Sequence, residues 1–362
     1  MAKQSSLADL HRRHGATFVE QDGWQLPEHI DQPIAEYDAV RKAAGLFDLS
    51  HRALLQFTGP DRVSFLQGML SNDVRLLKMF DGQPAAILNQ QGKVIADVRV
   101  LCAMNSIYLD FWEPLKEKIF QHLNRYLVAD DVAIHDPSDE WKMLSLQGPR
   151  ARPMLGELFV NTELPSQPDA HGMVQWDDFP VCVVRADRSG YNGFDLIVQT
   201  SKLLAFAKRL NELGAVWVGE RVQNVLRIEA GIPRYGIDFT EENLLLEVGL
   251  ENAVSFTKGC YLGQEVIERI RSRGHVNKKL CGLLLDGDAL ANAGDGIFAV
   301  DNDVGKITSS VASVALNRRI ALGYVHRDYW APGTSLSVRR ADRSIAATLT
   351  ALPFVPPASD TP

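Results

Sequence analysis

A cysteine between two glycines is the most informative chemical feature of the chain. The segment 258–265, with the sequence KGCYLGQE, places Cys260 between Gly259 and Gly263, and a helical pattern begins near Gly263. A thiol just before a helix N-terminus feels the positive end of the helix dipole, and Lys258 adds to that field. Cys260 is therefore either a reactive or ligand-contacting cysteine or a small side chain that fills a tight turn.

Two carboxylates lie among apolar residues, where a carboxylate is unusual. Glu229 ends the apolar stripe of a helix predicted over residues 220–230, and a buried carboxylate is costly unless it is paired. It either binds the polar edge of a ligand or ties down a nearby backbone. Asp97 shares one face of a predicted strand with Arg99, so it forms a surface ion pair or serves as an acid–base or amine-binding group.

Composition excludes several classes of protein. The 362 residues carry a formal net charge of −7, which argues against a nucleic-acid-binding surface over the whole molecule. No apolar run approaches the roughly 20 residues that span a bilayer, and the polar N-terminus does not resemble a signal peptide. The four cysteines lack CxxC spacing and the nine histidines lack paired spacing, so no metal site is proposed. We expect a cytoplasmic protein without direct nucleic-acid or membrane partners.

The elements that position these residues alternate between helices and strands. A hairpin is predicted around Asn89, whose second arm carries Asp97, and helices are predicted over 115–127, 201–213 and 220–230. From Lys278 onward, short strands and turns dominate and indicate a small β-barrel or sandwich. The fold class is α+β, and the length predicts two or three domains.

The chain resembles a known family through several motifs. Segment 258–265 and Arg269 match the signature K-G-C-[FY]-x-G-Q-E-x-x-x-R of YgfZ-type proteins at every position. More widely, roughly residues 7–355 resemble the glycine-cleavage T protein and its relatives. The segments that carry this resemblance are Gly45–His51, Leu70–Val74, Asn89–Asp97, Gln147–Pro149 and Leu226–Gly231.

The resemblance implies a fold and a cofactor. It implies three domains around a central channel that binds tetrahydrofolate: a discontinuous folate-binding domain (1–54 plus 143–274), an α+β domain (55–142) and a C-terminal β-barrel (275–362). Cys260 and Asp97 are then the expected catalytic residues. The expected cofactor-binding residues are Lys258, Tyr261, Gln264, Arg269, Glu229, Tyr191 and Asn89.

Three departures bear on the activity. Transferases of this family carry carboxylates at the positions that resemble Ala96, Tyr191 and Cys260. We therefore expect a tetrahydrofolate-binding accessory protein for iron–sulfur cluster assembly or repair, with iron–sulfur clients that include tRNA-modifying enzymes. The alternative is a tetrahydrofolate-dependent aminomethyl- or methyltransferase, or demethylase, acting on a small amine or sulfonium. A folate binder without chemistry is a third hypothesis, so enzymatic activity stays open.

Overall fold

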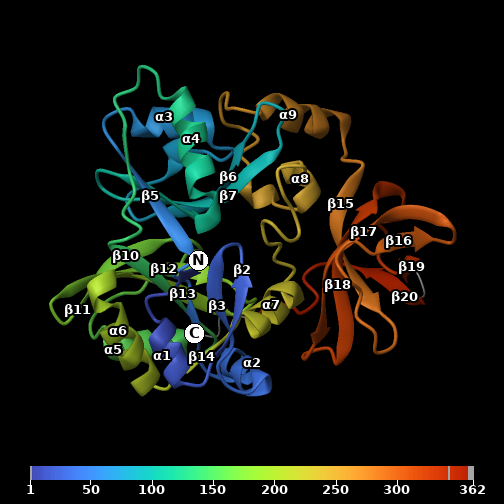
Figure 1. Ribbon diagram of the computed structural model, residues 1–362. Helices are drawn as coiled ribbons and strands as arrows, with labels where there is room; N and C mark the ends of the chain where they lie inside the picture. Colours follow the sequence, from blue (N-terminus) through green and yellow to red (C-terminus); the bar gives the residue numbers. More distant parts are fainter. Residues whose placement is uncertain (1, 341–342, 358–362) are drawn as a thin grey trace.

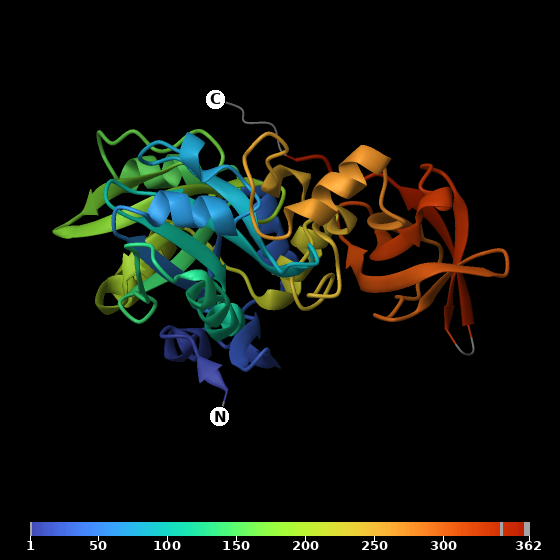
Figure 2. The same cartoon turned by 90° about the horizontal axis from the view of Figure 1, so that it is seen from above.

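The computed structural model describes residues 2–340 and 343–357, and Figure 1 shows their arrangement. Two large β-sheets and a small three-stranded sheet lie on one side of the described molecule, and a closed β-barrel lies on the other. Seen from above in Figure 2, the barrel forms a separate lobe. The α+β class and the C-terminal barrel are confirmed, whereas the division into three domains stays a prediction.

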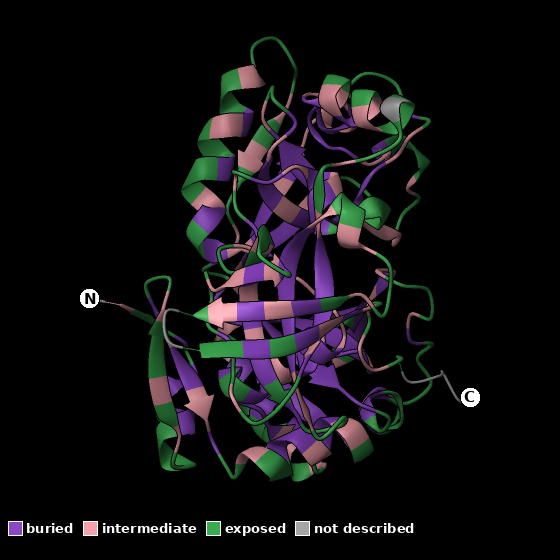
Figure 3. Cartoon of the chain, turned by 90° about the vertical axis from the view of Figure 1, so that its right-hand side faces the viewer, coloured by how far each residue is buried: buried purple, intermediate pink, exposed green. Residues whose placement is uncertain are grey.

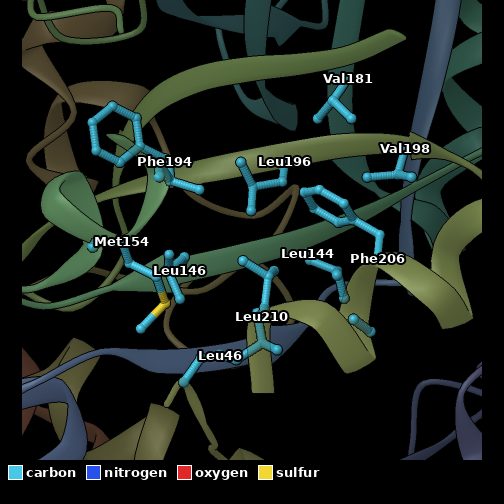
Figure 4. Packing of buried hydrophobic residues seen from close by; sticks show 14 of the residues in the cluster. Leu46, Leu144, Leu146, Met154, Val181, Phe194, Leu196, Val198, Phe206 and Leu210 are labelled. Atoms are coloured by element: carbon cyan, nitrogen blue, oxygen red, sulfur yellow. The ribbon is translucent and has the colours of Figure 1, made fainter. Parts of the chain in front are cut away.

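The larger sheet joins distant parts of the chain. Its strand order is β11 (His171–Trp176), β12 (Phe179–Asp187), β13 (Asn192–Gln199), β10 (Trp141–Gln147), β4 (Gly45–Asp48) and β14 (Val216–Trp217). Helices α5 (Ala151–Leu158) and α6 (Thr200–Glu212) cover one face. Figure 4 shows the resulting core, in which Phe206 and Leu210 of α6 meet Leu144, Leu196 and Val198 of the sheet.

The second sheet has the strand order β6 (Gly82–Leu88), β7 (Val94–Cys102), β8 (Ile107–Trp112), β5 (Arg52–Thr58) and β9 (Ala133–His135). Helices α3 (Arg62–Met69) and α4 (Lys116–Tyr126) pack on the face that carries Leu55 and Val98. The opposite face, with Leu54 and Leu101, packs against Ile197 of the larger sheet. The buried strands between the outer helices are visible in Figure 3. The two sheets therefore face each other across a seam.

The N-terminal segment completes the larger lobe. It contains β1 (Lys3–Gln4), α1 (Ala8–Arg13), β2 (Thr17–Gln21), β3 (Trp24–His29) and α2 (Pro33–Lys42), none of which the sequence pattern predicted. Helix α7 (Glu220–Glu229) packs against α2 and β3 on one side and against the barrel on the other. It is therefore the element that joins the two lobes.

The chain then crosses to the barrel. Helices α8 (Leu245–Val248) and α9 (Gln264–Arg273) lead into a barrel of strand order β15 (Lys278–Leu285), β18 (Arg318–His326), β17 (Asn302–Ser313), β16 (Gly296–Ala299), β19 (Ser335–Arg340) and β20 (Arg343–Thr350). Across the described ranges, no helix is both long and apolar enough to span a membrane.

Candidate functional site

A cavity of about 180 Å³, the central cavity, lies where the second sheet, β4 and α7 meet. Asp97 of β7 and Arg52 of β5 line it from the sheet, and Glu220 and Asn224 line it from α7. Its apolar and aromatic walls are formed by Phe47, Leu49, Trp112, Ile232, Pro233 and Tyr235. Ten of the sixteen lining residues are polar or charged. Apolar and aromatic walls combined with polar groups can orient a small molecule.

A wider cleft of about 730 Å³, the outer cleft, adjoins the central cavity. It lies between α7, the β2–β3 hairpin and barrel strand β17. Both spaces are lined by Glu220, Asn224, Arg227 and Arg234. A ligand longer than the central cavity therefore has room to extend outward along α7.

Asp97 is an unpaired carboxylate in the wall of the central cavity. No ion pair joins it to a cationic side chain within residues 2–340 and 343–357. Burial raises the pKa of the Asp97 carboxyl, and the charge of Arg52 offsets only part of that effect. A carboxyl with a raised pKa holds a proton more readily than an exposed one, and in its ionised form it can attract a cationic substrate.

Arg99 does not pair with Asp97, because two buried carboxylates, one from each of the two large sheets, hold its guanidinium. Its Nη2 atom lies 2.8 Å from Asp110 of β8 and 2.5 Å from Asp195 of β13. Arg52 lies 2.5 Å from Asp110, and Arg188 lies 2.6 Å from Asp195. These five residues form the arginine–aspartate network. The surface ion pair that strand alternation suggested for Asp97 is thus absent.

The network holds two carboxylates ionised inside the protein. Both Asp110 and Asp195 have side chains that are 0% exposed. Burial alone would raise the pKa of Asp195, but Arg188 and Arg99 outweigh it and hold that pKa well below its usual range. Asp97 therefore differs from its acidic neighbours in lacking a counter-ion.

Another part of the cavity wall combines an ion pair with aromatic rings. Arg234 Nη1 lies 2.8 Å from Glu220 Oε2, and its guanidinium stacks 4.6 Å from the centre of the Trp112 ring. His51 contacts Trp112 edge-on, and burial lowers the pKa of its imidazole to about 4. His51 is therefore neutral near pH 7. The sequence analysis missed these cavity residues, although His51 ends one of the segments that carried the resemblance.

The KGCYLGQE segment does not line the central cavity. It packs against α3 and the β6–β7 hairpin, where Tyr261 is buried beside Ile267. Gly263 has φ +84°, and a Cβ atom there would lie 2.6 Å from the carbonyl oxygen of Asn89. The side-chain oxygen of Asn89 accepts hydrogen bonds from two amides of its own turn. Local geometry therefore accounts for the glycine at position 263 and the asparagine at position 89.

Lys258 stabilises the C-terminus of α3. Its ammonium group donates hydrogen bonds to the carbonyl oxygens of Gln67, Leu70 and Asn72 at 2.7–2.8 Å. Gln67 lies in the last turn of α3, and Leu70 and Asn72 follow it. Carbonyl groups at a helix C-terminus need donors from outside the helix. Burial lowers the pKa of the ammonium to about 8. With its nitrogen engaged in this way, Lys258 has a structural task that the sequence analysis did not foresee.

We expect Lys258→Met to lower the free energy of unfolding by about 1–3 kcal/mol, because three carbonyl groups in buried or part-buried hydrogen bonds lose their donor. Urea unfolding measures the change. Lys208→Met on the exposed face of α6 makes the same chemical change without that loss and should be nearly neutral. Equal stabilities of the two variants would show that Lys258 is not a cap.

Cys260, Glu265 and the following Arg269 lie on the surface. Cys260 is an exposed free cysteine in the loop before α9. Gln264 accepts a hydrogen bond from the amide of Tyr261, and Arg269 pairs with Glu265 at 2.5 Å on the exposed side of α9. Cys260 is thus presented on the surface, and the structure places it apart from Asp97.

Glu229 and Tyr191 lie outside the central cavity as well. The Glu229 carboxylate accepts hydrogen bonds from Tyr37 of α2 and from Ser313 and the Ala315 amide of the barrel. Glu229 therefore links the two lobes. This agrees with the alternative in which its carboxylate holds a nearby backbone segment. Tyr191 is buried under the guanidinium of Arg41, 4.5 Å from its ring centre.

Of the nine site residues predicted from sequence, the structure places only Asp97 in the central cavity. The roles predicted for the other eight residues, folate contacts among them, remain predictions. In the part of the chain that the structure describes, no three His, Cys, Asp or Glu side chains are grouped to hold a metal ion.

Comparison with known families accounts for this architecture. The GCVT N-terminal domain matches residues 7–258, and the glycine cleavage T-protein C-terminal barrel domain matches residues 278–356. The chain belongs to the glycine-cleavage T-protein family. The T-protein resemblance stated from the motifs is therefore confirmed at the level of the family.

Similar proteins align with this T-protein family member over almost its whole length. An aminomethyltransferase of Rubrobacter xylanophilus is 32% identical over 97% of this chain and 94% of its own length. One from Bacillus licheniformis is 28% identical over 98% of this chain and 99% of its own. The crystal structure of glycine cleavage system aminomethyltransferase T from Bartonella henselae has a TM-score of 0.91, with 26% identity and 99% of both chains covered.

Proposed function

We propose that this T-protein family member is a tetrahydrofolate-dependent transferase that takes a one-carbon unit from a small amine or sulfonium. The observation that carries the proposal is the unpaired carboxylate of Asp97 in the wall of the central cavity. The relatives named aminomethyltransferases support it, since they match this chain over nearly its whole length. The proposal takes up the alternative left open by the sequence.

The residues of the site fit a flat, polar-edged ligand with a tail. Trp112, Phe47 and Tyr235 supply flat apolar walls, and the amide of Asn224 supplies a polar edge. The adjoining outer cleft offers space for an extended tail. Tetrahydrofolate, when bound, supplies a secondary amine nitrogen that accepts the one-carbon unit.

Asp97 serves this chemistry in two ways. Its carboxylate attracts a cationic amine or sulfonium into a partly apolar cavity, where charge interactions are stronger than in water. Its raised pKa lets it hold or accept a proton at the nitrogen of the departing amine. The neighbouring His51 is neutral and does not compete with the substrate for the negative charge.

Turnover of defined donors tests the proposal. The protein is incubated with tetrahydrofolate and either an S-aminomethyl thiol or a methyl sulfonium, and mass spectrometry follows methylene- or methyl-tetrahydrofolate. Product formation that depends on Asp97 supports the transferase. Tight folate binding without product from any donor class argues against it.

A second candidate is the accessory role in iron–sulfur cluster assembly or repair that the YgfZ-type signature implies. The observation that favours it is the exposure of Cys260 within a segment whose other side chains are largely engaged in packing. The proposed clients are iron–sulfur enzymes, including those that modify tRNA. Tyr191 and Ala96, which stand where transferases carry carboxylates, favour this role over transfer.

Under this second candidate, we expect Cys260→Ser to lower iron–sulfur enzyme activity to the level of cells lacking the protein, because serine cannot replace a thiolate. The readout is client activity in such cells complemented with each variant. Cys102→Ser, which changes a half-buried strand cysteine, is the matched control. Full client activity with Cys260→Ser would exclude a working thiol and leave the transferase as the remaining proposal.

A further inference from the structure

A second cavity lies in the same seam between the two sheets, beyond the arginine–aspartate network. Along β7, Asp97 lines the central cavity, Arg99 belongs to the network, and Leu101 lines the second cavity. The paired strands repeat this order, since Asp110 is opposite Arg99 and Tyr108 is opposite Leu101. The row of buried ion pairs therefore separates two spaces on one sheet face. We call the second one the seam cavity.

The seam cavity has the size and the lining of a small-molecule site. It holds about 340 Å³, and most of its wall is apolar or aromatic, including Trp141, Tyr108 and Phe80. No lysine or arginine lines it, and its single charged residue is Glu140. Glu140 is exposed and forms no ion pair with a described residue. An apolar space with one free carboxylate favours a cation, and the aromatic rings add to that preference.

A buried imidazole gives the seam cavity a polar end. His171 lines the cavity and is only 7% exposed. Its Nδ1 atom is buried without a hydrogen-bond partner, and burial lowers the pKa of the ring to about 4. The ring is neutral at pH 7, so one nitrogen donates and the other accepts. An unsatisfied buried polar atom calls for an explanation, and a ligand bond to the imidazole that lines the cavity would supply one.

The backbone beside His171 is held in an unusual conformation. Phe80, whose ring contacts the imidazole edge-on, has φ +73°, a region that large side chains rarely adopt. Hydrogen bonds from the Phe80 amide to Cys102 and from the His171 amide to Phe80 hold it there. Such strain concentrates at ligand sites.

We propose that the seam cavity binds a small aromatic amine in its cationic form, with the ammonium group attracted by Glu140 and a polar ring substituent bonded to His171. This site is distinct from the central cavity, and the inference does not rest on the proposed transferase activity. The aromatic ring of such an amine would lie in the seam cavity among the lining residues Trp141, Tyr108 and Phe80.

Three related compounds test the proposal by isothermal titration calorimetry on the full-length protein. Tyramine carries both polar groups, phenethylamine lacks the hydroxyl, and 4-hydroxyphenylacetate replaces the ammonium with a carboxylate. We expect saturable 1:1 binding of tyramine and about tenfold weaker binding of phenethylamine. We expect no binding of the anion.

Matched variants locate the site. Glu140→Gln should weaken tyramine binding about fivefold, whereas the same change at the exposed Glu163 should have no effect. In His171→Phe the difference between tyramine and phenethylamine should vanish. If His171→Phe does not fold, the exposed Glu140→Gln still decides, because it alters only the rim.

Three results would overturn the proposal. The first is the absence of saturable tyramine binding, and the second is equal binding of 4-hydroxyphenylacetate. The third is loss of tyramine binding in Asp97→Asn, which would put the amine in the central cavity and would favour the transferase instead. Intact tyramine binding in Asp97→Asn supports a separate site, whatever becomes of the transferase activity.

Discussion

Asp97→Asn is expected to lower kcat for one-carbon transfer by about 10²–10⁴-fold, the range for loss of a general acid–base group. Asparagine keeps the shape of the side chain but can neither accept the proton nor carry the charge. The affinity for tetrahydrofolate, measured by titration calorimetry, should change little, so the loss should appear in single-turnover rates. A variant that keeps its rate would remove Asp97 from the reaction.

The same variant is expected to be more stable than the wild type at neutral pH. The pKa of Asp97 is raised in the folded state, so folding takes up a proton between the unfolded value of about 3.9 and the folded value. The stability that Asp97 contributes is therefore lost as the pH rises between these two pKa values. The Asp97→Asn variant has no carboxyl group to titrate and does not undergo this loss. Thermal unfolding across pH measures this, with Asp130→Asn in an exposed loop as the control.

These opposite effects separate a functional carboxylate from a structural one. A carboxylate that mainly stabilises the fold loses both stability and activity when it is neutralised. A functional carboxylate kept unpaired costs stability, so its removal lowers activity and raises stability. A fall in both quantities for Asp97→Asn would indicate that the side chain has a stabilising partner and that the proposed role is wrong.

Much of the fold follows from short-range sequence patterns. The hairpin around Asn89 has turn residues between two apolar runs, and β6 and β7 form there. The helical stripe that ends at Glu229 becomes α7, and the strands after Lys278 close into the barrel. In each case neighbouring residues contain the information, because periodicity decides which face is buried.

The tasks of individual side chains depend on contacts between distant residues. Arg99 lies 96 positions from Asp195, and the sequence offers no means of seeing that this carboxylate, and not Asp97, holds the guanidinium. Lys258 likewise reaches back 188 positions to Leu70. The structure places Asp97, predicted from its motif to be catalytic, in the wall of the central cavity, and its catalytic role stays a prediction. The ligand contact predicted for Lys258 also stays a prediction, although its ammonium group already has three carbonyl partners.

The N-terminal strands escaped prediction for a related reason. β1 has only two residues and pairs in parallel with β3, so it has no periodicity of its own. Its place is fixed by tertiary contacts, such as the bond between Lys3 and Glu113 and the one between Trp24 and the same carboxylate. Short edge elements of this kind are determined by the sheet that receives them.

The largest change in stability is expected from Asp195→Asn, which should lower the free energy of unfolding by about 3–5 kcal/mol. The substitution removes one charge from the arginine–aspartate network and leaves Arg99 and Arg188 with a single strong partner, Asp110. A buried cation without its counter-ion costs far more than an exposed one. Urea unfolding followed by circular dichroism measures the change.

An exposed ion pair of the same length supplies the control. Arg188 and Asp195 lie 2.6 Å apart in the interior, and Arg318 and Asp286 lie 2.6 Å apart on the barrel surface. Asp286→Asn should therefore cost only about 0–1 kcal/mol, because solvent screens that pair. Similar losses in the two variants would mean that solvent also reaches the network and that it does not seal one cavity from the other.

Lowering the pH should reduce the difference in unfolding free energy between the wild type and Asp195→Asn. Burial opposes ionisation of Asp195, but Arg188 and Arg99 hold its pKa below the usual value, so the folded state binds fewer protons than the unfolded state at low pH. The stabilisation is fully present above the unfolded pKa of about 3.9 and is lost as the pH falls toward the folded pKa. The difference in unfolding free energy should thus be constant from pH 7 to 5 and shrink below pH 4. A difference that persists unchanged at pH 3 would attribute the loss to packing around residue 195 instead of to its charge.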